Sequence, residues 1–246
     1  AVLVGAPVIS TAWVNLLGFS EVQVGRVAGA DLGGLSVGAV ATSLFISKVS
    51  RRQIIIFGIF IACISNAACI SIVNYESVLW LRFLAGFGSG LITATAVSCL
   101  GASSRPALAF NAMLFAFAFS QAAEMHFLPM LSMANIYITF IICFLIIVPF
   151  LRWVPDNKST QEKNNAGIAG PIEGSSLFEE TLPRYVIWLC LSAIVITYIN
   201  IGAYWTYIEL AAASDNTDPE WVGSVLTWSS FCSLLGCLFA TLLSNK

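Results

Sequence analysis

Charged residues inside apolar stretches are the first candidates for chemistry in this sequence. Asp31, Arg82 and Glu124 each lie about five to eight residues from the end of such a stretch, or about 7 to 12 Å deep along a helix. A charge in hydrocarbon costs about 2.5 kcal/mol or more, so each needs a partner or a wet cavity. The three can meet in one layer. An opposite charge favours an ionised carboxylate and burial favours the neutral form. The cluster could therefore exchange a proton, or it could be a permanent ion pair that orients three helices.

The helix that carries Glu124 offers two further polar groups. Gln121 lies on the same face as Glu124, so both can point into one cavity. His126 lies about 200° around the helix from Glu124, so it cannot share that cavity. A proton relay through this imidazole is conceivable because its pKa lies near neutrality. We favour an interhelix hydrogen bond for His126.

Small residues follow Arg82 at helical spacing. Gly86 and Gly90 recur four residues apart on the face of Arg82, and Gly88 lies between them. A helix face without side chains forms a groove, which leaves room for a solute or for a neighbouring helix that slides along it. Close helix packing through small residues is the more common reason for the pattern.

Amide and aromatic side chains on other apolar stretches could line a cavity. Asn200 lies deep in its stretch, whereas Tyr204 belongs to a group of rings that could equally be an interfacial belt. The first and last stretches add Trp13, Asn15 and Trp228. Rings with amides suit a sugar, a nucleoside or an aromatic acid, and Arg82 would favour an anion.

Composition fixes the environment of these residues. Of 246 residues, 58% are apolar and 10% are charged, whereas soluble globular domains carry roughly 25% charged residues. That excludes a soluble globular protein, and the apolar content excludes a disordered one. The net charge of −2 argues against a nucleic-acid partner. The sequence is predicted to be an all-α integral membrane protein.

Eight apolar stretches are long enough, or nearly so, to cross a bilayer, which takes about 20 residues. Turn and cap residues separate the stretches, and the break around Ser132 is the weakest. The stretches cover residues 2–17, 22–46, 53–73, 77–100, 106–131, 134–154, 184–211 and 220–244. The sequence starts and stops inside apolar runs, so we expect a piece of a longer polypeptide. The seven cysteines lie singly in apolar stretches and are expected to be small core residues, with no metal site.

Orientation follows from the basic residues. If the amino end lies in the cytoplasm, Arg26 is the one basic residue at the outer end of a span, and Arg82 lies within a span. The other basic residues then lie on the cytoplasmic side: Lys48, Arg51, Arg52, Arg105, Arg152, Lys158, Lys163, Arg184 and Lys246. We therefore expect a multi-pass protein of the plasma membrane (the inner membrane in a bacterium). Residues 1–154 form an amino-terminal six-helix bundle, residues 155–183 a polar cytoplasmic linker, and residues 184–246 the start of a second bundle.

An internal repeat supports two bundles. The pattern Val-Gly-x-Val begins at Val24 and again at Val222, and Gly38 and Gly236 follow at equal distances. The same offset lays the first apolar stretch onto the seventh, as a duplicated six-helix unit requires.

Six helices, a cytoplasmic linker and a repeat of the first helices resemble the major facilitator superfamily of secondary transporters. The loop Ser43-Leu-Phe-Ile-Ser47-Lys48-Val-Ser50-Arg51-Arg52 is similar to that family's Gly-x-x-x-Asp-Arg-x-Gly-Arg-Arg signature. Its basic residues Lys48, Arg51 and Arg52 match, while serines replace both glycines and the aspartate. The resemblance implies that this loop helps to close the cytoplasmic side, although the loss of the aspartate weakens that role.

A second motif lies in the fourth stretch. Arg82-Phe-Leu-Ala-Gly86-Phe-Gly88-Ser-Gly90 resembles the family's Arg-x-x-x-Gly-x-Gly element. The fifth stretch lacks the Gly-Pro pattern of drug/proton antiporters, which favours uptake or facilitated movement. The resemblance implies secondary transport by alternating access but names no substrate. With the polar and charged residues above, we expect proton-coupled uptake or facilitated movement of a small polar or anionic organic solute. Twelve helices are usual, so the remaining helices of the same polypeptide would be partners, along with the solute, protons and the lipid bilayer.

Two other classes of function were weighed. An enzyme would need a nucleophile–base pair, metal ligands or a phosphate-binding loop, and the sequence shows none; no catalytic residue, metal or cofactor is expected. A sensor or receptor with a transporter fold remains the alternative. Its retinal form is excluded because every lysine lies in a loop or at the chain end.

Overall fold

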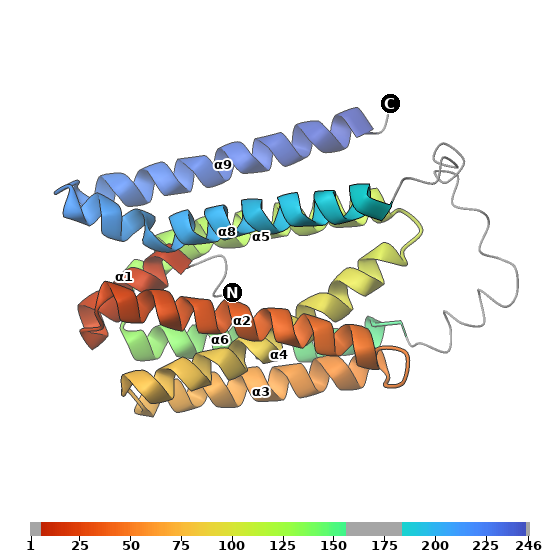
Figure 1. Ribbon diagram of the computed structural model, residues 1–246, viewed down its shortest axis with the longest axis horizontal. Coiled ribbons are helices and arrows are strands. Elements are labelled where there is room, and N and C mark those ends of the chain that lie inside the picture. The colour runs from red at the N-terminus through yellow and green to blue at the C-terminus, as the bar shows by residue number, and fades with distance from the viewer. Residues whose placement is uncertain (1–5, 156–183, 245–246) are drawn as a thin grey trace, which may run out of the picture.

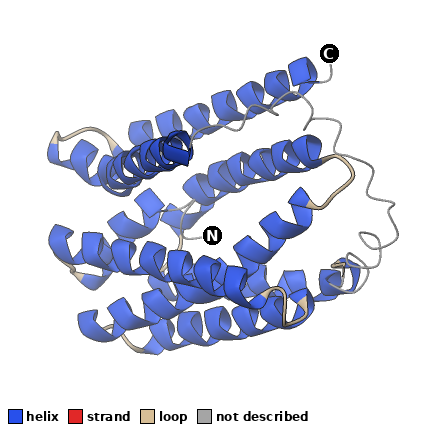
Figure 2. Cartoon of the chain, turned by 45° about the vertical axis from the view of Figure 1, so that its right-hand side comes forward, coloured by secondary structure: helices blue, strands red, loops and turns tan. Residues whose placement is uncertain are grey.

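The computed structural model describes residues 6–155 and 184–244, and within these ranges the chain is helical with no strand (Figures 1 and 2). Most of the long helices run side by side along the length of the molecule (Figure 1). The α-helices are α1 (Ala6–Leu17), α2 (Glu21–Phe45), α3 (Arg51–Ser71), α4 (Tyr75–Gly101), α5 (Pro106–Phe127), α6 (Met133–Ile147), α8 (Arg184–Ser214) and α9 (Pro219–Ser244). Two short 3-10 helices, η1 (Leu128–Met130) and η2 (Val148–Trp153), extend α5 and α6.

The described helices have the length and polarity of membrane spans. Five segments are long and apolar enough to cross a bilayer, namely Glu21–Phe45, Arg51–Ser71, Tyr75–Gly101, Pro106–Met130 and Met133–Trp153. Many of their large apolar side chains face outward, including Phe60, Trp80 and Phe119, each at least 60% exposed. An outward apolar surface of this extent belongs in lipid, so the predicted all-α membrane fold is confirmed.

Local capping chemistry places the helix starts close to the predicted breaks. Ser20 and Ser50 cap α2 and α3, each in a reciprocal capping box with a glutamine three residues later. Ser132 caps α6, at the break predicted least clearly. Gly18 adopts a φ of 68° at the end of α1, a conformation that costs glycine little.

Two predicted stretches differ from the structure at their ends. The fifth and sixth were expected to run as single helices to residues 131 and 154. Instead α5 ends at Phe127 and α6 at Ile147, and 3-10 turns containing Pro129 and Pro149 follow. Proline has no N–H to continue the α-helical bonding, so the geometry tightens there. The linker expected at 155–183 lies outside the described residues except for Pro155.

Helices far apart in sequence lie in contact. Within the first bundle (α1–α6), α2 packs on α4, and α3 packs on both α4 and α6. The contacts between this bundle and the last two helices run mainly from α1 to α8 and from α5 to α9. Figure 1 shows α8 and α9 lying above α2, α3, α4 and α6 in that view. These contacts place the end of the described chain against the first bundle.

Candidate functional site

A buried ion pair lies at the centre of the first bundle. Nη2 of Arg82 donates to Oδ1 of Asp31 at 3.0 Å, and Nη1 donates to Oδ1 of Asn66 at 2.9 Å. Arg82 and Asn66 are each 1% exposed and Asp31 is 6% exposed. Charge-assisted bonds of this kind are strong because little water screens them. One guanidinium therefore ties together α2, α3 and α4.

An aromatic pair extends this cluster to two more helices. The ring centre of Tyr137 on α6 lies 5.8 Å from the guanidinium carbon of Arg82, a distance that allows a cation–π attraction. The indole Nε1 of Trp13 on α1 donates to the hydroxyl of Tyr137 at 3.1 Å. Both aromatic residues are 1% exposed. The cluster of Trp13, Asp31, Asn66, Arg82 and Tyr137, here called the arginine cluster, joins five helices.

Glycines bring the two charged helices close enough for the pair to form. A Cβ on Gly86 would overlap the backbone of Asp31, and one on Gly90 would overlap the backbone of Leu35. Gly88, on the other side of α4, lies against Gly58 of α3. The glycines that follow Arg82 thus pack helix against helix, and they leave no groove open to a solute in this conformation.

A small cavity lies beside the carboxylate of Asp31. It has a volume of about 10 Å³, and its lining includes Ser10 and Trp13 from α1, Asp31 from α2 and Thr206 from α8. That is about the volume one water molecule needs. Ser10 is fully buried, and its Oγ has no hydrogen-bond partner among the described residues. The charged layer of the first bundle therefore borders α8 across a small cavity that has both apolar and polar walls.

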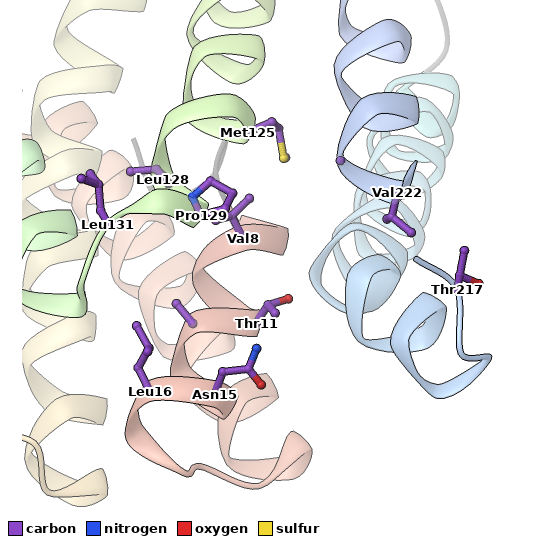
Figure 3. A pocket seen from close by; sticks show the side chains of 12 residues that line it. Val8, Thr11, Asn15, Leu16, Met125, Leu128, Pro129, Leu131, Thr217 and Val222 are labelled. Atoms are coloured by element: carbon purple, nitrogen blue, oxygen red, sulfur yellow. The ribbon is translucent and has the colours of Figure 1, made fainter. Parts of the chain in front are cut away.

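A larger cavity of about 340 Å³ lies between the first bundle and α9 (Figure 3). In Figure 3, Thr11 and Asn15 of α1 point toward the gap, and Val222 of α9 lies across it. Its lining is Val8, Thr11, Ala12, Asn15, Leu16, Met125, Leu128, Pro129, Leu131, Thr217, Val222 and Gly223. The lining residues that the structure describes are all uncharged. The size falls in the range of small-molecule pockets.

The neighbour described for Glu124 differs from those described for Asp31 and Arg82. The groups that surround Arg82 are Asp31, Asn66, Cys69 and Tyr137, whereas Glu124 lies within electrostatic reach of Cys143 on α6. Glu124 and its neighbour Gln121 are both half-buried. The structure thus shows the pairing of Asp31 with Arg82, and a place for Glu124 in the same layer stays a prediction.

The aromatic and amide residues expected to line one cavity with Asn15 lie elsewhere. The amide of Asn200 donates weakly to the carbonyl of Ile196 on its own helix, at 3.4 Å. Tyr204 lines a third cavity between α8 and α9, and Trp228 is 70% exposed. None of the three lines the 340 Å³ cavity, and Trp13 lies inside the arginine cluster instead.

The basic residues of the loop after α2 have three different surroundings. Lys48 is exposed, whereas Arg51 is only 7% exposed and approaches Cys99 at the end of α4. Arg52 donates to the carbonyls of Arg152 and Val154, each at 3.1 Å. Arg52 therefore holds the start of α3 against the end of η2.

Four residues of the site escaped the sequence analysis: Ser10, Asn66, Tyr137 and Thr206. Asn66 stands out in retrospect, as the one amide inside the third stretch, whose other amide, Gln53, is its first residue. Polar residues inside membrane helices usually need a partner, so Asn66 could have been paired with Arg82. Nothing in the sequence distinguishes Ser10 or Thr206 from other small hydroxyl residues.

Comparison with known proteins bears on the whole chain. The family model described as Major Facilitator Superfamily matches residues 4–246. No curated protein and no solved structure gives a significant match.

Proposed function

Because the chain belongs to the major facilitator superfamily, whose members are secondary transporters, we propose that it moves a small polar organic solute across a membrane by alternating access. We propose further that Asp31 carries the coupling proton. The observation that supports this assignment is the position of Asp31, between the guanidinium of Arg82 and the small cavity that Thr206 of α8 helps to line.

The charge state of Asp31 has two consequences at this position. An ionised Asp31 balances Arg82, whose other described neighbours, Asn66, Cys69 and Tyr137, are neutral groups. When a proton adds to a carboxylate oxygen of Asp31, the pair loses its Coulomb attraction and Arg82 is left uncompensated. That state is favoured only where another arrangement of the helices solvates the guanidinium.

The motion that would expose Asp31 runs between α8 and the first bundle. The small cavity has walls from α1, α2 and α8. If α8 tilts away, the cavity widens and water can reach Asp31; if α8 returns, the carboxylate is sealed. Proton exchange at Asp31 is then linked to the movement of one bundle past the other.

The helices that carry the ion pair are packed tightly, while the contacts across the interface run from α1 to α8, from α5 to α9 and through one bond from α8 to α2. Inside the bundle, α2 and α4 meet through glycines at backbone distance. Across the interface, the hydroxyl of Tyr207 on α8 donates to the carbonyl of Glu21 at 3.2 Å, beside Gly25. One such bond can break and re-form during a cycle at little cost.

The proposal includes the direction of the chain in the membrane. We place the amino end, the loop with Lys48 and the segment 155–183 in the cytoplasm, in agreement with the positive-inside rule. Residues 1–154 form the first moving bundle, and α8 and α9 belong to the second. Arg82 is 1% exposed and donates from Nη1 to Asn66 and from Nη2 to Asp31, so an anionic solute does not reach its guanidinium in this conformation.

Transport by the full-length protein in proteoliposomes tests the proposal. A panel of radiolabelled sugars, nucleosides and aromatic acids is offered with and without an inward proton gradient. We expect one solute class to accumulate with the gradient. Asp31→Asn should abolish this accumulation and retain solute exchange, which also shows that the variant folds.

Glu124→Gln is the matched control, since Glu124 is another carboxylate in the same bundle, half-buried where Asp31 is buried. We expect it to keep gradient-driven accumulation. If Asp31→Asn accumulates solute as the unmodified protein does, Asp31 does not carry the proton. If no solute of the panel is moved at all, the transport proposal itself fails.

A further inference from the structure

We infer that Asn66 is a positioning residue for the proton carrier: it holds the guanidinium of Arg82 in a single-bonded contact with Asp31 and so leaves the second carboxylate oxygen of Asp31 for the proton. The inference rests on the proposed proton transfer at Asp31 and adds the residue that sets how firmly the carboxylate is held.

The amide of Asn66 is fixed in one orientation at the centre of the first bundle. Its Nδ2 donates to the carbonyl of Ala62 on the same helix at 2.7 Å, and its Oδ1 accepts from Nη1 of Arg82 at 2.9 Å. A flipped amide would turn its N–H groups toward the guanidinium, which has only donors. Both Asn66 and Arg82 are buried, so little water competes for the bond.

Close packing of α3 on α4 brings Asn66 within reach of Arg82. A Cβ on Gly88 of α4 would overlap backbone atoms of Gly58 and Ala62 of α3. Ala62 is also the residue whose carbonyl fixes the amide of Asn66. The position of Asn66 relative to Arg82 is therefore set by contacts within the first bundle.

The ion pair between Arg82 and Asp31 has fewer bonds than the two groups can form. Nη2 of Arg82 donates to Oδ1 of Asp31 at 3.0 Å, and no hydrogen bond joins Arg82 to Oδ2 in the described part of the chain. Nε of Arg82 is buried and has no hydrogen-bond partner there either. Arginine and a carboxylate often form two parallel bonds, which hold the pair more strongly. Because Asn66 holds Nη1, the guanidinium cannot turn its Nη1–Nη2 edge toward Asp31.

The second oxygen of Asp31 can therefore take a proton without breaking a bond to Arg82. Asp31 lines the small cavity together with Ser10 and Thr206, so water that enters when α8 tilts reaches the carboxylate. With a proton on Oδ2, Arg82 keeps its bonds to Asn66 and to Oδ1 of Asp31. Asn66 thus lowers the cost of the protonated state, which a two-bonded pair would raise.

Other groups around the pair do not obscure a carboxyl signal. The thiol of Cys69 on α3 and the hydroxyl of Tyr137 on α6 are the further titratable groups described beside the guanidinium. Neither contains a carbonyl. The small cavity adds three residues of α1 and α8 that do not ionise: Ser10, Trp13 and Thr206.

Infrared titration of the purified full-length protein tests the inference without a solute. The C=O band of a carboxyl group grows as the carboxylate takes up a proton. Subtracting the spectrum of Asp31→Asn at each pH isolates the band of Asp31. Asn66→Leu and Asn66→Asp are then titrated in the same way, each with and without Asp31→Asn.

We expect the band of Asp31 to reach half its intensity at a pH about one unit lower in Asn66→Leu, because the released Nη1 allows a two-bonded pair that keeps Asp31 ionised. In Asn66→Asp, two carboxylates share Arg82, so the first carboxyl band should appear at a higher pH than in the unmodified protein. Opposite shifts from two substitutions at one position do not follow from a loss of stability.

Ile59→Ala is the control for destabilisation. Ile59 is buried on α3 about two turns from Asn66 and packs with Ile55 and Leu151. This variant should lower the thermal unfolding midpoint and leave the band of Asp31 in place.

An unchanged or higher half-point in Asn66→Leu would overturn the inference and leave Asp31 as the proton carrier, and so would equal shifts in Asn66→Leu and Ile59→Ala. If Asp31→Asn removes no carboxyl band at any pH at which the protein stays folded, Asp31 does not take up a proton, and the role of Asn66 fails with it.

Discussion

Gly86 of α4 lies directly against the backbone of Asp31 of α2, one helical turn from the point where the carboxylate of Asp31 meets Arg82. The close approach of the two backbones and the ion pair therefore depend on each other. A side chain at position 86 would move α2 away and lengthen the bond between the two charges.

Gly86→Ala is expected to destabilise the protein, by about 1–3 kcal/mol, because the added methyl overlaps backbone atoms that cannot rotate away. Gly33→Ala is the matched control on α2, where a Cβ meets nothing within 4 Å. Alanine is a better helix former than glycine, so Gly33→Ala should be neutral or slightly stabilising. Thermal unfolding in detergent compares the two, and equal midpoints would contradict the close contact.

Asp31→Leu is expected to cost about 3–5 kcal/mol of stability, since it leaves the buried guanidinium of Arg82 without its charge partner. Combining it with Arg82→Met removes both charges and should recover most of the loss. Chemical or thermal unfolding of the two variants checks this. If the double variant is as unstable as the single one, apolar packing rather than charge compensation explains the effect.

The bond between Trp13 and Tyr137 is expected to contribute about 1 kcal/mol, the usual net value of a buried hydrogen bond. A double-mutant cycle with Trp13→Phe and Tyr137→Phe isolates this energy from the packing of the rings. Purely additive losses would show that the indole and the hydroxyl do not interact.

Ser10→Ala is expected to be neutral or stabilising by up to about 1 kcal/mol, because the buried hydroxyl of Ser10 has no partner among the described residues. Thr42→Val is the comparison. The hydroxyl of Thr42 donates to Gly38 on its own helix and lies 3.4 Å from the carbonyl of Leu91 on α4, so its removal should destabilise. A clear loss of stability in Ser10→Ala would indicate that a bound water satisfies this hydroxyl.

Arg52→Gln is expected to speed amide hydrogen exchange in residues 148–154, since it removes the bonds to the carbonyls of Arg152 and Val154. Lys48→Gln, at an exposed residue of the same loop, removes an equal charge and should leave that exchange unchanged. If Lys48→Gln speeds the exchange as much as Arg52→Gln does, the loss of charge rather than the loss of the two hydrogen bonds explains the faster exchange.

The sequence predicted helices and their breaks well because lipid and caps act locally. Apolar length sets each span, and Ser20, Ser50 and Gly18 set where the chain turns. Residue depth also follows from sequence, which is why Asp31 and Arg82 could be expected at one level. The sequence does not show in the same way which face of each helix points into the bundle, because lipid and the bundle interior are both apolar.

Glu124 and Trp13 illustrate this difference. By depth alone Glu124 matches Asp31, yet the neighbour described for Glu124 is Cys143, whereas Asp31 binds Arg82. Trp13 lies on the same short helix as Asn15, but one residue is buried against Tyr137 and the other borders a cavity. Which face of α1 meets which neighbour depends on packing between segments more than a hundred residues apart, and no local pattern encodes it.

Tyr207 rests beside Gly25 near the Glu21 end of α2 and bonds to the Glu21 carbonyl. A contact at one end of a long helix can act as the pivot about which the helix tilts. For any tilt about this point, the Glu21 end stays nearly still while the Phe45 end, about 36 Å away at 1.5 Å per residue, sweeps the widest arc. In such a tilt, the contact of Tyr207 would determine which end of α2 moves furthest relative to α8.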